Sequence, residues 1–375
     1  MTSGMTDRTT AATDPDGPAP EATEQAHHAA LTADEHGGID LRVLDQQVRA
    51  AFDLPASTPV RRELLGGGLS QTTIRYRFEP GGPHASVIVR IPPVHGPLAP
   101  YSPEGEAALL RWLTGHGIAV PRVLSSGPAG GPLGRAFLIS EEISGDVVRD
   151  GARGYTDQDK TLLAHAYTAA LAGFHGLAGA ERSAEVLDWA PRKDPAGVLD
   201  RWTRSLAETG LVLPDFHRFL TDWLGDRMPA TGTTTVVHGD FRLGNVLWRR
   251  PGEISAILDW EEAGAGDPYF DLGWTLMGTD APEDSMMGVL SRREFLARYE
   301  DLAGTEVDRE RLLWWEIAAG WSRLCMEAKA IALIDEGHYL DLRPLLSTYL
   351  NRRLSIVLLE KIQRHEGTRT GSEHL

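Results

Sequence analysis

Residues 236–271 read VVHGDFRLGNVLWRRPGEISAILDWEEAGAGDPYFD, and this stretch decides the fold and the chemistry that we expect of the chain. Between short apolar runs typical of buried strands it places His238, Asp240, Asn245 and Asp259. A carboxylate, an amide five residues later and a second carboxylate fourteen residues further on are the groups that Mg²⁺-dependent phosphoryl transfer needs. We predict that Asp240 is the catalytic base that orients a hydroxyl nucleophile. Asn245 and Asp259 are predicted to hold Mg²⁺, because this ion prefers hard oxygen ligands.

Three short strings carry a family resemblance. They read His238-Gly239-Asp240-x4-Asn245, Ile257-Leu258-Asp259-Trp260-Glu261 and Gly266-Asp267-Pro268. Together they resemble the aminoglycoside phosphotransferase-like family of small-molecule kinases, and they are most similar to the branch found near or fused to acyl-CoA dehydrogenases. The resemblance runs from about Leu64 to the C-terminal helices. It implies an α+β, bilobal protein-kinase-like fold, with a small antiparallel β-sheet lobe, a mainly helical lobe, and ATP and Mg²⁺ between them.

The composition of the 375-residue chain is that of a globular protein, with 42% apolar and 24% charged residues. A formal net charge of −16 argues against nonspecific binding to nucleic acid, which depends on Lys and Arg neutralising phosphates. Cys325 is the only cysteine, so neither an intrachain disulfide nor a cysteine zinc cluster can form. No apolar run is long enough to span a bilayer, and the N-terminus lacks a signal pattern. We therefore expect a cytoplasmic protein without a membrane partner.

The chain divides into three predicted regions. Residues 1–38 are rich in Thr, Ala, Pro, Asp and Gly and are expected to form a disordered tail. Residues 39–143 are expected to form the ATP-binding lobe, and residues 144–375 the helical lobe with the catalytic loop and substrate cleft. The first lobe should open with a short amphipathic helix. Its apolar residues have helical spacing and Asp40 is placed to cap it.

A glycine cluster follows the first predicted strand. Three strands are expected between Glu63 and Ile91, and the first turn contains Gly66, Gly67, Gly68 and Ser70. Glycine lets the backbone approach phosphate oxygens closely and present its N–H groups to them. We predict that Gly67, Gly68 and Ser70 bind the nucleotide. A hairpin turn without a ligand is the alternative, because glycine often only marks a turn.

A cation is expected on the third strand. Arg90 stands where most of the wider kinase-like superfamily has lysine, and a guanidinium can bind phosphate oxygens through two hydrogen bonds. The alternative is a solvated arginine at a strand end. Its predicted partner is Glu106, on a helix from Pro103 to His116, with Glu104 as the rival. An ion pair from strand to helix would fix the position of the cation, as in protein kinases.

The resemblance also implies a hinge between the lobes. Two strands are expected from Val120 to Ile143, and in the family the backbone after such a strand hydrogen-bonds the adenine. Glu141 and Ile143 are therefore predicted to contribute main-chain groups to nucleotide binding.

Several polar residues near the predicted site are expected to support its structure. His175 lies on a helix that otherwise resembles core, where a lone histidine is usually structural. His238 has no second His or Cys at zinc-ligand spacing and is expected to brace its loop. For Asp271, on a helix from Pro268 to Met277, the resemblance implies hydrogen bonds to the backbone of the catalytic loop.

The acceptor is predicted only as a class. We expect the γ-phosphoryl group of ATP to move to a hydroxyl of a small molecule. The branch suggests a hydroxyacyl thioester-like metabolite, and the wider family suggests an antibiotic or other natural product. The candidate acceptor-binding residues are Arg292, Arg293 and Arg298 for an acyl-CoA, and Glu283 and Asp284 for a cationic aminoglycoside. The alternative function is a catalytically weak, nucleotide-binding pseudokinase that acts as a scaffold, supported only by the arginine in place of lysine.

Overall fold

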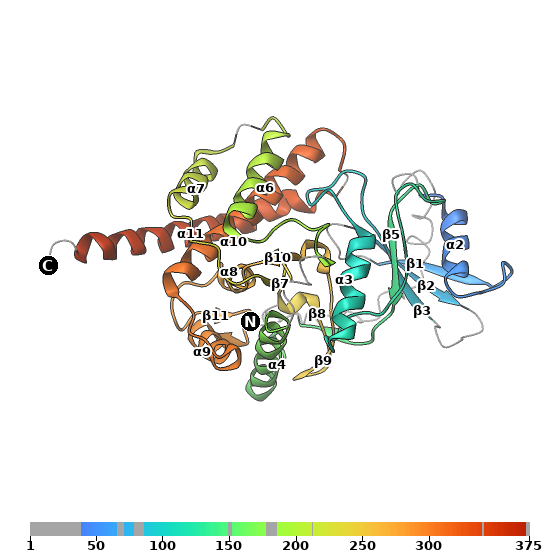
Figure 1. The fold of residues 1–375 in the computed structure, drawn as a ribbon, viewed down its shortest axis with the longest axis horizontal. Helices are drawn as coiled ribbons and strands as arrows, with labels where there is room; N and C mark the ends of the chain where they lie inside the picture. The colour runs from blue at the N-terminus through green and yellow to red at the C-terminus, as the bar shows by residue number, and fades with distance from the viewer. Residues whose placement is uncertain are drawn as a thin grey trace, which may run out of the picture.

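The structure is a computed structural model, and it describes residues 39–65, 71–78, 86–148, 152–177, 186–211, 213–339 and 341–372. Two lobes are visible, with a sheet at one end of the molecule and helices at the other (Figure 1). This arrangement confirms the predicted bilobal α+β fold. The predicted tail and the turn residues Gly67, Gly68 and Ser70 lie outside the described residues.

Antiparallel strands form the sheet of the small lobe, in the order β1-β2-β3-β5-β4. They span Val60–Leu64 (β1), Thr72–Phe78 (β2), Ser86–Ile91 (β3), Val123–Gly127 (β4) and Phe137–Glu141 (β5). Strands β2 and β3 are rich in β-branched and aromatic residues, which suit a pleated, half-buried surface. The strands predicted in these two stretches are therefore present.

Side-chain alternation along β5 assigns the two faces of the sheet to two helices. These are α2 (Leu41–Ala50) and α3 (Pro103–Gly115). Phe137 and Ile139 lie in one core with α2, whereas Leu138 lies in the core that contains α3. A strand directs successive side chains to opposite faces, so one strand serves both cores. Figure 1 accordingly shows α3 between the sheet and the larger lobe.

The chain leaves the first sheet for a second one after β5. Strand β6 (Asp146–Val147) pairs with β8 (Val246–Arg250), which pairs with β9 (Glu253–Ile257). The backbone N–H of Ile257 also donates to the Ala119 carbonyl at 2.7 Å, just beyond α3. The buried side chains of α3 share one hydrophobic cluster with the larger lobe. The predicted boundary at residue 143 stays a prediction, because this core is continuous across it.

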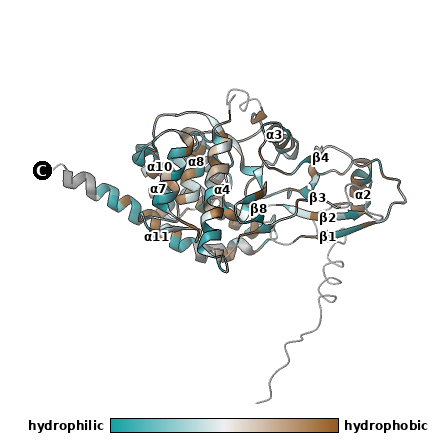
Figure 2. Cartoon of the chain, turned by 90° about the horizontal axis from the view of Figure 1, so that it is seen from below, coloured by the Kyte–Doolittle hydropathy of each residue, from teal (hydrophilic) through white to brown (hydrophobic). Residues whose placement is uncertain are grey.

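Helices make up most of the larger lobe, and Figure 2 shows hydrophilic and hydrophobic residues mixed along them. They are α4 (Asp157–His175), α6 (Pro195–Ala207), α7 (Asp215–Asp226), α8 (Tyr269–Leu276), α9 (Arg292–Ala303), α10 (Arg309–Asp335) and α11 (Arg343–Ser372). The short elements are β7 (Thr235–Val237), η2 (Leu243–Asn245), η3 (Trp260–Glu262), β10 (Gly264–Gly266), β11 (Ser285–Met286) and β12 (Leu290–Ser291). The helices expected in this half of the chain are therefore present.

Helix α8 forms a rigid support in the larger lobe. Its residues from Phe270 to Leu276 are all buried. A Cβ atom at Gly273 would lie 2.5 Å from the backbone oxygen of Trp315 on α10, so glycine permits the close approach of the two helices. The side chains that α8 directs at its neighbours are consequently fixed by packing.

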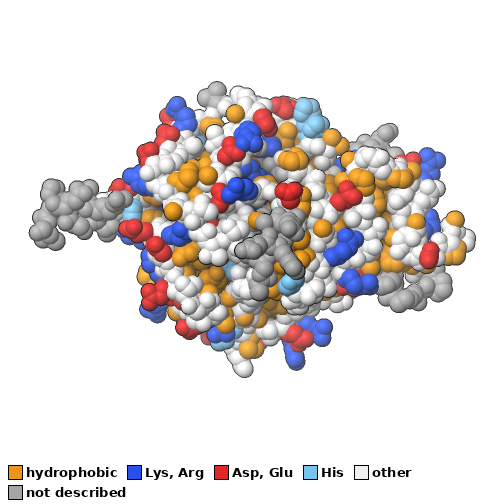
Figure 3. All heavy atoms as spheres, viewed as in Figure 1, with side chains coloured by type: hydrophobic (Ala, Val, Ile, Leu, Met, Phe, Trp, Pro, Cys, Tyr) orange, Lys and Arg blue, Asp and Glu red, His pale blue; other side chains and the backbone are white. Residues whose placement is uncertain are grey.

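The visible surface carries both signs of charge. Basic and acidic side chains are interspersed over the face in Figure 3. Among the helices of the described ranges, none combines the length and apolar character of a membrane span.

Candidate active site

Asp271 binds the start of the predicted catalytic loop, residues 238–245. The backbone N–H groups of His238 and Gly239 donate to its two carboxylate oxygens, each at 2.8 Å, and His175 Nε2 lies 3.1 Å from Oδ2. Burial raises the pKa of Asp271, but the hydrogen bonds from His175 and from the His238 backbone outweigh it and hold that pKa below its usual range. The ionised carboxylate therefore fixes the loop, as the resemblance implied.

Gly239 is required at the turn that follows β7. Its φ of +87° lies in the left-handed region, and an added Cβ would meet the backbone oxygen of Glu262 at 2.2 Å. A side chain would be strained both by the backbone conformation and by this contact. The turn thereby places Asp240 directly after the strand.

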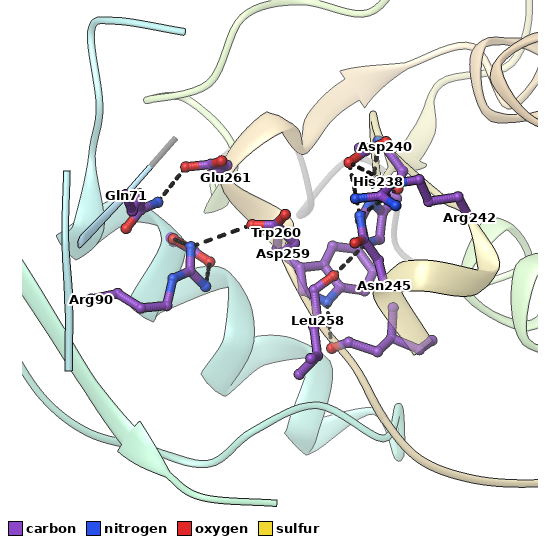
Figure 4. Close-up of polar contacts among 12 residues, drawn as sticks. Gln71, Arg90, His238, Asp240, Arg242, Asn245, Leu258, Asp259, Trp260 and Glu261 are labelled. Atoms are coloured by element: carbon purple, nitrogen blue, oxygen red, sulfur yellow. Dashed lines mark hydrogen bonds and ion pairs between the residues drawn. The ribbon is translucent and has the colours of Figure 1, made fainter. Parts of the chain in front are cut away.

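Asp240 and Asn245 are joined within the loop. The Asn245 Nδ2 group donates to the Asp240 backbone oxygen at 2.9 Å and to its carboxylate Oδ2 at 2.8 Å. Trp274 Nε1 donates to Oδ1 at 2.8 Å. Arg242 Nε lies 3.3 Å from Oδ2, and Figure 4 shows Arg242 and Asn245 beside the Asp240 carboxylate. The carboxylate predicted to be the base is thus held in one orientation.

Asp259 follows β9 in an unusual backbone conformation. Its φ of 69° and ψ of 53° are left-handed, which aspartate tolerates better than most residues and which often marks a functional position. The preceding residue, Leu258, donates its N–H to the Asn245 carbonyl at 2.8 Å, and its own carbonyl lies 2.9 Å from His238 Nε2. The loop and the end of β9 are therefore joined, and His238 is the predicted brace.

The donor groups around this junction suit Mg²⁺. Because Nδ2 of Asn245 is used in hydrogen bonds, its amide oxygen is the atom left for a metal, and among the described residues it accepts no hydrogen bond. The Asp259 side chain is 36% exposed and supplies a second hard oxygen. Two protein ligands suffice for an ion that keeps several waters. In the described part of the chain, no three His, Cys, Asp or Glu residues cluster as a metal site.

The predicted ion pair between Arg90 and Glu106 is present. Its two hydrogen bonds measure 2.8 and 3.0 Å, and Arg90 Nη2 lies 3.8 Å from Asp259 Oδ1. Burial lowers the pKa of Arg90, but the carboxylates of Glu106, Asp259 and Glu261 raise it by more, so the guanidinium stays charged. Burial raises the pKa of Glu106, although Arg90 opposes this. The rival, Glu104, is exposed on α3.

The predicted hinge residues, Glu141 and Ile143, lie at the end of β5 and just beyond it. The N–H of Glu141 donates to the Arg122 carbonyl at 3.0 Å, and Glu141 is paired with Val87 of β3 in the sheet. Ile143 lies two residues beyond β5 and is partly buried. Gln71 of the small lobe hydrogen-bonds Glu261, two residues after Asp259. The nucleotide-binding roles of Glu141 and Ile143 stay predictions.

Two features of the site were missed from the sequence. One is Trp274, whose only signal was its spacing of three residues from Asp271, which puts both on one side of α8. The other is a buried charge cluster beside Gly239, in which Glu262 binds Lys193 at 3.0 Å and Arg201 through two bonds of 2.6 Å. Burial raises the pKa of Glu262, but the two cations lower it to about 2. Partners from distant elements leave no local pattern.

The acceptor-binding candidates are mostly occupied by other contacts. Arg292 pairs with the buried Glu316, and Arg293 pairs with Glu283 at 2.8 Å. The Asp284 carboxylate accepts the Asp280 and Ala281 backbone N–H groups of its own turn. These side chains stabilise the helical lobe, and within the described part of the chain none of their hydrogen bonds or ion pairs reaches residues 238–245. A separate surface cavity between α6, α7 and α10 contains none of the site residues.

A bilobal α+β fold, with Asp240 bonded to Asn245 in one loop and Asp259 beside Arg90 of the small lobe, is typical of protein-kinase-like phosphotransferases. Residues 61–315 match the model of the phosphotransferase enzyme family, APH, and the chain belongs to this family. It is therefore a phosphotransferase of the small-molecule kinase class.

The relatives cover this chain to different extents. Acyl-CoA dehydrogenase family member 10 of Mus musculus is 28% identical over 187 residues, which make up 48% of this chain but only 17% of that protein. Aminoglycoside 3′-phosphotransferase of Streptomyces fradiae is 26% identical over 254 residues, covering 63% of this chain and 87% of the relative. A solved structure from Ralstonia eutropha, assigned to the aminoglycoside phosphotransferases, has a TM-score of 0.64 at 20% identity and covers 87% of this chain and 99% of its own. This last likeness concerns the fold.

Proposed function

We propose that the protein binds ATP with Mg²⁺ between its lobes and transfers the γ-phosphoryl group to a hydroxyl of a small molecule. The observation that carries the proposal is the chain of hydrogen bonds from Asp240 through Asn245 to Leu258, next to Asp259. It joins the loop that carries the proposed base and one proposed metal ligand to Leu258, the residue before the other proposed ligand, Asp259, which lies 3.8 Å from Arg90. This is the set of groups that kinase chemistry uses.

Each residue has one role in the proposed reaction. The hydroxyl oxygen of the acceptor forms a bond to the γ-phosphorus, the bond to the ADP oxygen breaks, and the hydroxyl proton passes to Asp240. Arg90 binds phosphate oxygens, while Glu106 fixes its guanidinium. Asn245 and Asp259 would hold Mg²⁺, which when bound neutralises charge on the phosphate oxygens.

Two acceptor classes follow from the relatives. The acyl-CoA dehydrogenase relative favours a hydroxyacyl thioester, and the Streptomyces relative favours an antibiotic hydroxyl. A cytoplasmic location remains part of the proposal, since a metabolite acceptor and ATP are both found there.

The test is calorimetry with Mg·ATP, followed by measurement of ADP formation with hydroxyacyl thioesters, aminoglycosides and macrolides as acceptors. We expect Mg·ATP to bind and at least one acceptor to gain one phosphoryl group by mass spectrometry. Binding without turnover on any acceptor, or with water, would overturn the proposal in favour of a nucleotide-binding scaffold. Absence of Mg·ATP binding would overturn both.

A further inference from the structure

The hydrogen bonds to Asp240 are distributed unequally between its two carboxylate oxygens. Oδ2 accepts from Asn245 Nδ2 at 2.8 Å and from Arg242 Nε at 3.3 Å. Oδ1 accepts from one described donor, Trp274 Nε1, at 2.8 Å. A carboxylate offers about four acceptor positions, two on each oxygen. Three are therefore in use, and the remaining one is on Oδ1.

We propose that Trp274 is a positioning residue that fixes Oδ1 of Asp240 as the oxygen that receives the acceptor hydroxyl. This inference rests on the proposed function, because it gives an atom to the role assigned there to Asp240. With both positions on Oδ2 occupied, an incoming O–H finds its acceptor on Oδ1. Donors to a carboxylate lie near the plane of the group, so the indole N–H fixes that plane. The free acceptor position on Oδ1 then points in one direction.

The surroundings of Trp274 make its indole a fixed donor. The side chain is 6% exposed and lies in the core between α8 and α10. It stacks on Phe270 with ring centroids 6.1 Å apart and planes 11° apart. Gly273 brings this turn of α8 against the backbone of α10. The N–H group therefore has little freedom to leave the carboxylate.

One helical turn thus controls both the backbone and the side chain of the catalytic residue. Asp271 binds the N–H groups of His238 and Gly239, which sets the position of the loop. Trp274, three residues later, sets the orientation of the Asp240 carboxylate. A displacement of α8 would move both together, so the geometry between them is preserved.

The chemical consequence concerns the proton. As the hydroxyl oxygen bonds to phosphorus and the bond to ADP breaks, the O–H bond breaks and its proton moves to Oδ1. The N–H···O hydrogen bond from Trp274 fixes the direction of the carboxylate and so makes Oδ1 a well-aimed acceptor. Such an acceptor suits a transition state in which positioning matters more than early proton removal.

The test compares Trp274→Phe with Trp314→Phe. Trp314 is a matched control, because it is also buried and its Nε1 donates to the Leu224 carbonyl at 3.0 Å, away from Asp240. The readouts are kcat and KM for ATP with the best acceptor of the panel, and Mg·ATP hydrolysis with water as acceptor. We expect kcat of Trp274→Phe to fall about tenfold or more, from loss of a hydrogen bond to a charged group. KM for ATP should stay unchanged and the melting temperature should match that of the control.

Two further variants distinguish loss of the Trp274 hydrogen bond from an effect on packing. Trp274→His retains a ring N–H and is expected to recover part of the lost kcat. Adding Trp274→Phe to Asp240→Asn should cost less than it does in the wild type, because the two residues act as a unit. Equal kcat in Trp274→Phe and Trp314→Phe, or equal losses in Trp274→Phe and Trp274→His, would overturn the inference. Full activity in Asp240→Asn would instead overturn the role that the proposed function assigns to Asp240.

Discussion

The proposed acceptor side and the proposed nucleotide side of the site are held in different ways. On the acceptor side, the polar groups of the catalytic loop are bonded to neighbours fixed by the core, namely Asp271, Trp274 and the backbone of Leu258. On the nucleotide side, Arg90 is held by its pair with Glu106, and its approach to Asp259 is 3.8 Å. That separation is too long for a charge-assisted hydrogen bond.

The comparison indicates which side chains of the site are rigid and which can change orientation. Asp240 is oriented before any ligand binds, because both its oxygens have donors. The Asp259 carboxylate is more exposed and is not fixed by Arg90, so it can turn toward a metal. We infer that the acceptor side is preorganised and that the nucleotide side completes its contacts with Mg·ATP. Substitutions on the two sides should therefore change different kinetic constants.

The largest effect is expected from Asp240→Asn, which removes the proton acceptor on the rigid side. We expect kcat to fall by about a hundredfold to ten-thousandfold, the usual contribution of acid–base catalysis. Mg·ATP affinity and the melting temperature should stay unchanged, since the amide retains the size of the carboxylate. Asp280→Asn is the charge-matched control, because Asp280 pairs with Arg364 in the helical lobe. Loss of nucleotide affinity in Asp240→Asn would show that the two sides are not separate.

A second test concerns the metal ligand on the adjustable side. Asp259→Asn should raise the Mg²⁺ concentration for half-maximal ATP binding by roughly ten- to a hundredfold. Calorimetry at a series of Mg²⁺ concentrations measures this without turnover. Glu261→Gln is the matched control, since that side chain is two residues away and bonded to Gln71. A metal defect in Glu261→Gln and not in Asp259→Asn would move the ligand assignment to Glu261.

Arg90→Lys tests the bidentate contact on the same side. Lysine keeps the charge but cannot match two oxygens of Glu106 and of a phosphate with a planar fork. KM for ATP should rise about tenfold, with kcat changed much less. Arg75→Lys is the control, because Arg75 lies on neighbouring β2 and also pairs with two carboxylates, Glu63 and Glu142. Equal effects of the two substitutions would indicate damage to the small lobe rather than to phosphate binding.

On both sides of the site, residues that follow strands in the chain were predictable from the sequence. Asp240 lies three residues after β7, Asn245 ends η2, and Asp259 lies two residues after β9, so the apolar runs before them indicated where these polar residues leave the strands. The same holds for Glu106, whose distance from Arg90 corresponds to one strand followed by one helix. Periodicity and strand order determine contacts of this kind.

Contacts made by packing between distant elements were not predictable. Trp274 donates to Asp240 although the two residues are 34 positions apart in the sequence. The position of Trp274 depends on the packing of α8 against α10, which Gly273 permits. Lys193 joins Glu262 because the segment before α6 lies along β10. Such partners are chosen by the three-dimensional arrangement, and a buried tryptophan in sequence predicts only core. The sequence therefore predicts the reacting groups better than the groups that orient them.

The smallest expected effect is a pH dependence confined to the nucleotide side. Burial raises the pKa of Glu106 above its ordinary 4.5. The folded protein therefore protonates Glu106 at a pH at which the unfolded chain keeps it ionised. Protonation of Glu106 thus does not reduce the free energy of unfolding. It removes the carboxylate that holds Arg90. KM for ATP should thus rise as the pH falls from 7 toward the raised pKa of Glu106, while protonation of this group should not lower the melting temperature.

Glu106→Gln separates this effect from protonation of ATP. The variant should have a raised KM at pH 7 and should show only the pH dependence that ATP itself contributes. The difference between the two pH curves then measures the titration of Glu106. If the curves of wild type and variant run parallel, Arg90 is positioned by something other than Glu106. In that case the nucleotide side would be as firmly preorganised as the catalytic loop, because a guanidinium that keeps its place without its partner must be held by the surrounding sheet.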